Sequence, residues 1–474
     1  MTRSLALLLA CCLPLAACKP SFAALAENKA PPAAALAGTD AAARARQAAD
    51  AWLAAFNAGD RASLEAYAKR WNPELDVERM LAFRNDTGGF RLVRREDAPA
   101  GAAHALVQER ESDSVARIAA TITPEGHARL EIEVVEPPED LRVARLSQQD
   151  TLDALVAKAD AQAAKDAFSG VLLVARGDEV LLQRAWGTAD RAAGTPVAMD
   201  TKFRVGSMNK MFTAVATLQL VQAGQLSLDD TVGAVLRGYP NADVAQVTIR
   251  QLLTHAGGTG DIFGPEFDAK RLSLKTHEDY VRLYGARGTE HAPGTEQRYS
   301  NYGFLLLGRI IEQASGQSYY DYVDAHVFGP AGMRDSGSLP EDVAVPGRAV
   351  AYTRRDDAWV DAADTLPYRG TSAGGGYSTA GDLLKFARAL QDGTLLSPDL
   401  LAEATRNQTP WYGYGFMARE QDGVRFFGHG GGAPGMNGDL RIYPASGVVV
   451  LGLSNLDPPV VERLVSYYLL RMPE

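Results

Sequence analysis

Hydrophobic and polar positions divide the chain into two stretches of different pattern. In the first, residues 41–60 carry apolar side chains at helical spacing, with the aromatic residues on one side. Gly59 is placed to end this helix and Asp60 to cap the next one. Four strand-like runs follow: FRLVRRE, HALVQER, VARIAATI and ARLEIEVVE. Helices followed by a run of antiparallel strands predict a small α+β domain over residues 41–145.

The pattern changes after VVEPPED, where paired prolines mark a boundary. Residues 148–165 predict an amphipathic helix capped by Asp150 or Thr151. SGVLLVARGDEVLLQRAWG predicts two strands around a turn, and GDLRIYPASGVVVLGLSN predicts a second hairpin before the closing helix PPVVERLVSYYLL. Between these ends the chain is mostly helical. We therefore expect a second domain over 147–474, with one sheet assembled from its two ends.

The first 18 residues have the layout of a secretory signal, with Arg3, an apolar run and then small residues. The run is shorter than the roughly 20 apolar residues of a membrane-spanning helix. Its end, LAAC, resembles a bacterial lipobox, in which Cys18 becomes the lipid-bearing first residue. An ordinary signal cleaved nearby is the alternative. By the same resemblance, Lys19 favours the outer membrane, so we expect a lipoprotein on its periplasmic face or a soluble periplasmic protein.

Residues 19–40 are rich in alanine, contain paired prolines and predict a flexible linker. The net charge of −10 argues against nucleic acid as a partner, because phosphate binding requires a basic surface. All three cysteines, Cys11, Cys12 and Cys18, lie in the leader. The rest of the chain therefore has no thiol nucleophile and no cysteine-ligated zinc. With no H-E-x-x-H and no Walker-type loop either, we expect neither metal nor cofactor.

One short segment, FRVGSMNKMF, carries candidate chemistry. Ser207 precedes an apolar helical pattern, so it lies at or near a helix N-terminus, and Lys210 follows three residues later on the same face. A serine hydroxyl is a poor nucleophile unless a base takes its proton. A buried lysine can assist, and the N–H groups of the helix end can stabilise an oxyanion. By itself, this pattern also fits a capping serine beside an exposed lysine.

Two further segments supply partners for a serine nucleophile. In RYSNYG, Tyr299 could accept a proton if its hydroxyl lies beside a lysine, and the amide of Asn301 could orient the pair or the substrate. In FFGHGGGAPG, three glycines follow His429 and would let a strand approach a ligand closely. Each segment also has a plain structural explanation, a half-buried aromatic residue in the first and a glycine-rich turn in the second.

The order S-x-x-K, Y-x-N and H-G-G resembles the serine hydrolase superfamily of class C β-lactamases, D-alanyl-D-alanine carboxypeptidases and related esterases. LLTHAGG, FGPAGM and SAGGGYSTAGDLLKFA strengthen the resemblance, which covers about 150–470. It implies an antiparallel sheet flanked by helices, with an all-helical subdomain. The AWLAAFNAGD segment loosely resembles the opening of NTF2-like domains, which concerns only residues 41–145. The roles that the superfamily implies are Ser207 as nucleophile, Lys210 and Tyr299 as base pair, and Asn301, His429, Gly430, Gly431 and Gly432 in substrate binding and the oxyanion hole.

One departure bears on substrate choice. β-Lactamases usually carry lysine where this chain has His429, and an unperturbed histidine is mostly uncharged at neutral pH. A fixed positive charge for a substrate carboxylate is therefore missing, which favours an esterase or peptidase over a true β-lactamase. His255 is expected to brace a loop. The alternatives are a catalytically silent sensor that binds cell-wall fragments, and an assembly factor whose first domain carries the main role.

Overall fold

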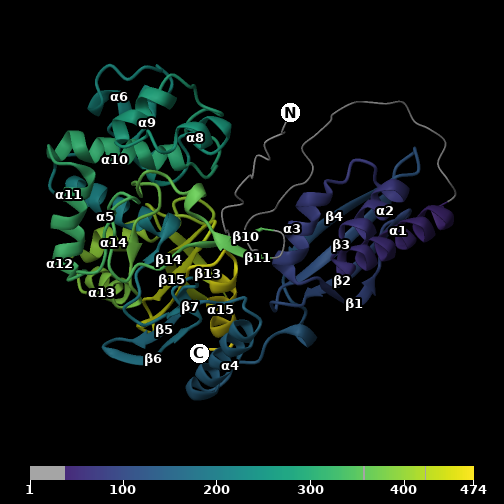
Figure 1. Ribbon diagram of the computed structural model, residues 1–474. Helices are drawn as coiled ribbons and strands as arrows, with labels where there is room; N and C mark the ends of the chain where they lie inside the picture. Colours follow the sequence, from purple (N-terminus) through teal and green to yellow (C-terminus); the bar gives the residue numbers. More distant parts are fainter. Residues whose placement is uncertain (1–37, 356–357, 422, 474) are drawn as a thin grey trace. The chain divides into compact units, whose positions relative to one another are not determined.

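The computed structural model describes residues 38–355, 358–421 and 423–473 (Figure 1). The predicted signal peptide, its Cys18 and most of the predicted linker lie outside the described residues. The contacts divide the described chain into two compact units, one over residues 152–465 and one over the residues up to 151 together with residues 466–473. Each unit is described here by itself.

The smaller unit places three helices against an antiparallel sheet in the order β1-β2-β3-β4. The helix predicted at 41–60 begins slightly earlier, inside the predicted linker, and Asp60 caps the next helix by accepting the Ser63 N–H at 2.8 Å. Trp52 and Phe56 stack at 4.6 Å between ring centroids in its core. The bounds are α1 Gly38–Ala58, α2 Arg61–Trp71, α3 Val77–Thr87, β1 Phe90–Glu96, β2 Ala102–Glu109, β3 Val115–Ile122 and β4 Ala128–Val135.

The larger unit is built on a six-stranded antiparallel sheet among the described residues, in the order β13-β14-β15-β16-β5-β6. The N-terminal hairpin pairs with the C-terminal one through β16 and β5, which is the predicted assembly of one sheet from both chain ends. The bounds are β5 Gly170–Arg176, β6 Glu179–Trp186, β13 Met417–Gln421, β14 Val424–Ala433, β15 Met436–Tyr443 and β16 Val448–Ser454.

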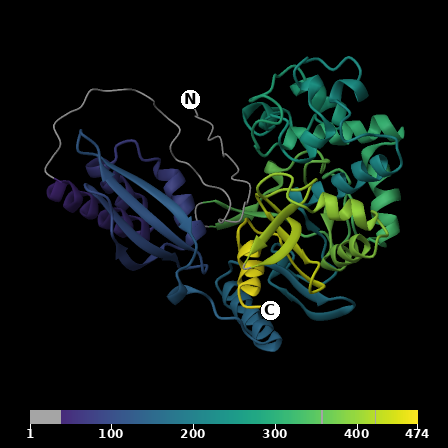
Figure 2. The same cartoon turned by 180° about the vertical axis from the view of Figure 1, so that it is seen from behind.

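Alternation along the strands explains how this sheet is covered on both faces. In β5, Val171 and Leu173 belong to the main core cluster, while Leu172 points to the other face. On that other face, a β-carbon added at Gly452 would stand 2.8 Å from both Leu172 and Val461, so α15 packs closely there. Figure 2 shows the sheet and this helix from behind. The helices that flank the sheet are α4 Gln148–Ala164, α5 Asn209–Gln222, α13 Ala380–Gln391 and α15 Val460–Leu469.

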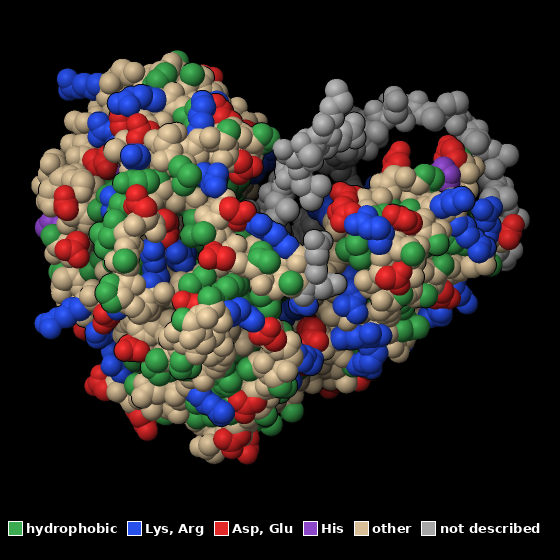
Figure 3. Space-filling view, in the orientation of Figure 1, with side chains coloured by type: hydrophobic (Ala, Val, Ile, Leu, Met, Phe, Trp, Pro, Cys, Tyr) green, Lys and Arg blue, Asp and Glu red, His purple; other side chains and the backbone are tan. Residues whose placement is uncertain are grey.

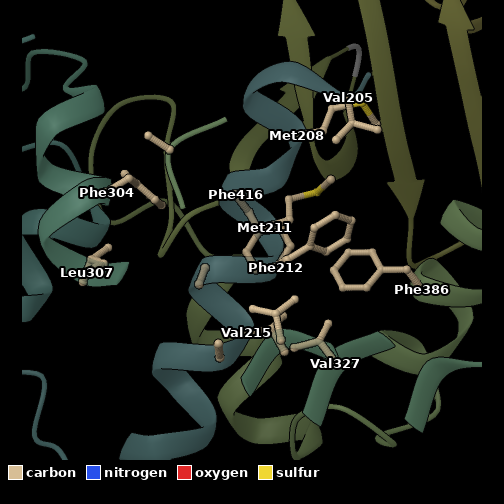
Figure 4. Packing of buried hydrophobic residues seen from close by; sticks show 14 of the residues in the cluster. Val205, Met208, Met211, Phe212, Val215, Phe304, Leu307, Val327, Phe386 and Phe416 are labelled. Atoms are coloured by element: carbon tan, nitrogen blue, oxygen red, sulfur yellow. The ribbon is translucent and has the colours of Figure 1, made fainter. Parts of the chain in front are cut away.

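The helix α5 runs through the centre of the larger unit and is buried almost all round. Figure 4 shows Met211, Phe212 and Val215 of α5 packed among residues of several other elements. The Phe212 ring meets the Phe386 ring edge-on at 4.8 Å between centroids. Full burial of such a side chain contributes about 2 kcal/mol, so this packing fixes α5 and the residues at its start firmly.

A group of mostly short helices forms one end of the larger unit (Figure 1). The longest, α10, contacts α5, α7 and α9. This group includes α6 Val232–Val235, α7 Ile249–Leu253, α8 Pro265–Lys270, α9 His277–Tyr284 and α10 Asn301–Ser315; the other helices of the unit are α11 Tyr319–Val323, α12 Gly329–Ala331 and α14 Pro398–Ala404. The remaining strands are short: β7 Thr188–Asp190, β8 Thr195–Pro196, β9 Phe203–Arg204, β10 Tyr352–Arg355, β11 Ala358–Asp361 and β12 Tyr377–Ser378.

Some local predictions are wrong. The helix predicted at 148–165 is not capped by Asp150 or Thr151, because the helix already begins at Gln148 and the Ser147 hydroxyl accepts the Asp150 N–H. For the glycines after His429, the alternative of a turn is wrong and the expectation of a strand holds, since they lie inside strand β14. Among the described residues, no helix is long and apolar enough to cross a membrane. On the face of the larger unit seen in Figure 3, acidic and basic side chains are interspersed.

Candidate active site

Ser207 lies in a tight turn between β9 and α5. The turn is the 3-10 helix Gly206–Met208, which leads directly into α5. Gly206 has a φ of 54°, and a β-carbon at this position would stand 3.0 Å from the nitrogen of Gly432. Glycine is therefore required both by the left-handed backbone and by the close approach of β14. The turn leaves Ser207 half-buried, whereas its neighbours Gly206 and Met208 are buried.

Lys210 lies one turn into α5 and is completely buried. Its Nζ is 3.2 Å from Ser207 Oγ and 2.8 Å from Asn301 Oδ1, and it also donates to the carbonyl of Ala373. A buried ammonium must be satisfied by acceptors, and these three hold it beside the serine hydroxyl. The alternative of an exposed lysine behind a capping serine is therefore wrong.

Tyr299 stands immediately before α10, next to the lysine. Lys210 Nζ lies 4.7 Å from the centroid of the Tyr299 ring, within the range of a cation–π contact. Ser300 caps α10 by accepting the Gly303 N–H, and its own backbone is extended, with φ −136° and ψ 116°. In an extended segment, side chains two residues apart lie on the same side, which is how a Y-x-N sequence presents a phenol and an amide to the same amine.

Asp261 fixes the amide of Asn301 from the side away from the lysine. The Asn301 Nδ2 group lies 2.9 and 3.2 Å from the two carboxylate oxygens of Asp261. A carboxylate only accepts and an ammonium only donates, so the amide between Asp261 and Lys210 has one orientation. Sequence reasoning missed Asp261, although an acidic residue directly after the LLTHAGGTG run was a usable signal.

Strand β14 brings the third motif against the Ser207 turn. Its pairing with β13 ends at Gly428, so the strand beyond is free of β13 and faces the turn. A β-carbon at Gly431 would stand 2.0 Å from the Val205 carbonyl oxygen and 3.0 Å from the Ser207 nitrogen. The Gly432 nitrogen thus lies beside Gly206 and the Ser207 nitrogen beside Gly431, so the two backbone N–H groups that the resemblance assigns to the oxyanion hole come from segments in close contact.

The side chain of His429 is buried, and its Nε2 lies 2.8 Å from the hydroxyl of Tyr412. Burial, assisted by the charge of Lys210, lowers the pKa of His429 to about 3. The ring is therefore neutral at ordinary pH and supplies no cation for a substrate carboxylate. Tyr412 was missed because the WYGYGF segment gave no indication of which aromatic residue points inward.

His255 braces the segment that carries Tyr299, as the sequence predicts. Its Nδ1 accepts the Ser300 N–H at 3.1 Å, and its ring lies 4.3 Å from the Tyr299 ring centroid. The residue has a φ of 58°, which costs about 1 kcal/mol for a side chain other than glycine. Burial, then the nearby charge of Lys210, lowers the pKa of His255 well below its ordinary value. A neutral imidazole is what its accepting Nδ1 requires.

No group of three or more histidine, cysteine, aspartate or glutamate side chains with metal-binding geometry occurs in the described part of the chain. The groups that converge at residue 207 are instead a hydroxyl, an amine, a phenol, an amide and backbone N–H groups. This set can perform nucleophilic acyl transfer with proton exchange between oxygen and nitrogen.

The fold and the site together define an enzyme of the serine hydrolase class with a β-lactamase-like fold. The chain belongs to the Beta-lactamase family, whose model matches residues 152–471. Penicillin-binding protein 4 of Amycolatopsis lactamdurans is 33% identical over 60% of this chain and 80% of its own. Esterase EstB of Burkholderia gladioli is 34% identical over 53% of this chain and 75% of its own.

A solved structure, a D-stereospecific amidohydrolase from Streptomyces, covers 66% of this chain and 97% of its own, with a TM-score of 0.57 and 28% identity. The predicted fold class of the larger domain and the predicted superfamily are confirmed. The family contains esterases, D-amino acid amidases and penicillin-binding proteins, so membership alone does not select the bond that is cleaved.

Proposed function

We propose that this protein hydrolyses an ester or amide through an acyl-enzyme on Ser207. The observation that carries the proposal is the 3.2 Å approach of the buried Lys210 amine to the Ser207 hydroxyl. Tyr299, beside the Lys210 ammonium, is the member of the base pair that takes the hydroxyl proton as the oxygen attacks the substrate carbonyl, while Lys210 donates to the acceptors around it. The N–H groups of Ser207 and Gly432 bind the resulting oxyanion. Collapse expels the alcohol or amine, which receives the proton, and water then releases the acid from Ser207.

Esters and amides without a carboxylate beside the scissile bond are the favoured substrates within this class. The neutral, buried His429 stands where β-lactamases carry lysine, and its ring contacts Tyr412. Similarity to esterase EstB and to a D-stereospecific amidohydrolase supports the same preference. A screen of short-chain esters, D-alanyl peptides and a chromogenic β-lactam tests it. Cleavage of the β-lactam faster than every ester would contradict the preference.

The nucleophile itself is tested with a fluorophosphonate probe. We expect covalent labelling of the wild-type chain and none of Ser207→Ala, because the variant lacks the attacking oxygen. Unchanged labelling of the variant would remove the proposal. Labelling of one equivalent without any ester or amide turnover would instead support the silent sensor of cell-wall fragments.

We also propose export, with a lipid anchor at Cys18. The support is the sequence of the leader alone, in which an apolar run is followed by LAAC. In a bacterial host that processes lipoproteins, the wild-type protein is expected in the membrane fraction and Cys18→Ser outside it. Equal partition of the two would contradict the anchor.

A further inference from the structure

Apart from the groups around Ser207, a serine, a histidine and an acid are joined by hydrogen bonds in the interior of the larger unit. His277 Nε2 is 2.9 Å from the hydroxyl of Ser372, and His277 Nδ1 is 2.9 Å from Glu312 Oε1. The contacts join a serine to a histidine and the histidine to an acid, as in a catalytic triad. Ser372 and His277 are buried, at 0% and 1% exposure, so no substrate reaches this serine. The array must serve another purpose.

The hydrogen bonds fix the protonation of the His277 ring. The backbone N–H of Ser372 donates to Nε2 at 3.3 Å, so Nε2 presents its lone pair and Nδ1 carries the proton toward Glu312. Burial is the largest influence and acts to raise the pKa of Glu312, but the hydrogen bonds from His277 and the Tyr319 N–H, together with nearby positive charge, outweigh it, and the pKa falls below its ordinary value. The carboxylate therefore remains an acceptor, and the ring remains an anchor for the Ser372 amide.

The anchored segment, residues 371–373, presents three successive carbonyls to α5. Asn209 Nδ2 donates to the Thr371 carbonyl at 2.5 Å, and the Thr213 hydroxyl donates to the Ser372 carbonyl at 2.7 Å. The third carbonyl, that of Ala373, accepts from Lys210 Nζ. Residues 371–373 are thus held between His277 on one side and the helix that carries the active-site lysine on the other.

A glycine in α10 makes room for this array. A β-carbon at Gly308 would stand 2.3 Å from Ser372 Oγ and 2.6 Å from His277 Nε2. Any other residue at this position would push the ring and the serine apart, because α10 is fixed by its own packing. The close contact between His277 and Ser372 therefore depends on three parts of the chain: α9, α10 and residues 371–373.

We propose that His277 and Glu312 are positioning residues for the reaction at Ser207. By anchoring the Ser372 amide, they hold the Ala373 carbonyl where it accepts from Lys210, and so keep the lysine amine directed at the Ser207 hydroxyl. The inference rests on the proposed function of Ser207 and Lys210. Misplacement of a reacting group by about 1 Å can cost a hundredfold in rate, so a loosened carbonyl is expected to slow acylation strongly.

The test compares His277→Leu, which fills the space without an acceptor, with His277→Gln, whose Oε1 can accept the Ser372 N–H. In the full chain, the rate of fluorophosphonate labelling at Ser207 and the kcat and KM for a short-chain ester are measured. We expect His277→Leu to lower labelling rate and kcat by about tenfold or more with little change in KM, and His277→Gln to recover most of the loss. Val281→Ala, which removes packing from the same helix, is expected to lower Tm while leaving kcat near the wild-type value.

Should His277→Leu not fold, the pair Glu312→Leu and Glu312→Gln gives the same comparison, because only glutamine keeps an acceptor for the Nδ1 proton. Equal labelling rates for wild type and the folded leucine variant would overturn the positioning role alone. A wild-type chain that is not labelled at Ser207 would overturn the proposed function, and this inference with it.

Discussion

At the residue scale, the orientation of one amide controls one of the three acceptors that hold the active-site lysine. Asn301 offers its oxygen to Lys210 because its nitrogen is engaged by the carboxylate of Asp261. With Asp261→Asn, the Asn301 amide can turn over and present hydrogens to the ammonium, which disfavours the catalytic arrangement. We expect kcat/KM for a short-chain ester to fall by about tenfold, since a charge-assisted hydrogen bond contributes roughly 1.5–3 kcal/mol.

The control for this prediction is Glu290→Gln, which also removes a negative charge near the Gly258–Gly260 turn but leaves the Asn301 amide alone. Its kcat/KM is expected to stay within about twofold of wild type, because exposed charges contribute little. If Asp261→Asn retained the wild-type kcat/KM, the carboxylate would have no part in orienting the amide.

The buried His429 predicts how stability depends on pH. Burial, then the charge of Lys210, places its pKa at about 3 in the folded chain, against 6.5 ordinarily. Between these values the unfolded chain binds a proton that the folded chain does not, so stability rises with pH up to about 6.5 and is level above. From pH 7.5 down to 4.5, this residue alone is expected to lower the free energy of unfolding by about 3 kcal/mol.

Urea unfolding of wild type and His429→Gln at pH 7.5 and pH 4.5 measures this contribution. Part of the pH-dependent loss should disappear in the variant, while the contribution of the similarly buried His255 remains. Tyr412→Phe, which removes the hydrogen bond to His429 but keeps the ring buried, is expected to retain the loss. An identical pH dependence in wild type and His429→Gln would show that the ring titrates normally in the folded chain.

At the element scale, strand β14 approaches the nucleophile only because it lacks a side chain at 431. A methyl group in Gly431→Ala would meet the Val205 carbonyl oxygen at 2.0 Å, so the strand and the Ser207 turn must separate. We expect ester hydrolysis to fall by roughly a hundredfold, the cost of losing one oxyanion-hole donor. Stopped-flow acylation with a chromogenic ester measures it.

The matched control is Gly381→Ala in α13, where the nearest atom would be 3.9 Å from the new methyl group. Alanine replaces glycine favourably inside a helix, so the control is expected to keep its activity and gain a few tenths of a kcal/mol in stability. Wild-type acylation in Gly431→Ala would mean that β14 takes no part in binding the oxyanion.

The elements differ from the active site in how far the sequence predicts them. β1 and β3 begin and end where alternation places them, and Asp60 caps α2 as predicted. These features depend on a few neighbouring residues. The carbonyl of Ala373, the carboxylate of Asp261 and the hydroxyl of Tyr412 reach the site through contacts over many residues of sequence, which periodicity does not encode. The helices α6 to α9 are too short to show a clear period.

At the scale of the whole molecule, the proposed reaction involves residues of the larger unit and none of the smaller one. The residues that converge on Ser207, including Lys210 and Tyr299, lie within residues 152–465. The smaller unit has its own core around Trp52 and Phe56. It also includes the C-terminal residues, since Arg471 pairs with Asp113 at 2.8 Å. No group from residues 41–145 takes part in the proposed reaction.

A chain without residues 41–145 is therefore expected to hydrolyse a short-chain ester with kcat/KM within about twofold of the full chain, because none of the groups proposed to act on the substrate is removed. It should also be less stable, because Arg471 loses its carboxylate partner. Asp113→Ala in the full chain isolates that loss and should leave kcat/KM unchanged. An activity loss in the deletion but not in Asp113→Ala would mean that the smaller unit contributes to hydrolysis. Retained activity with altered localisation would instead support the assembly role, with hydrolysis carried by the larger unit alone.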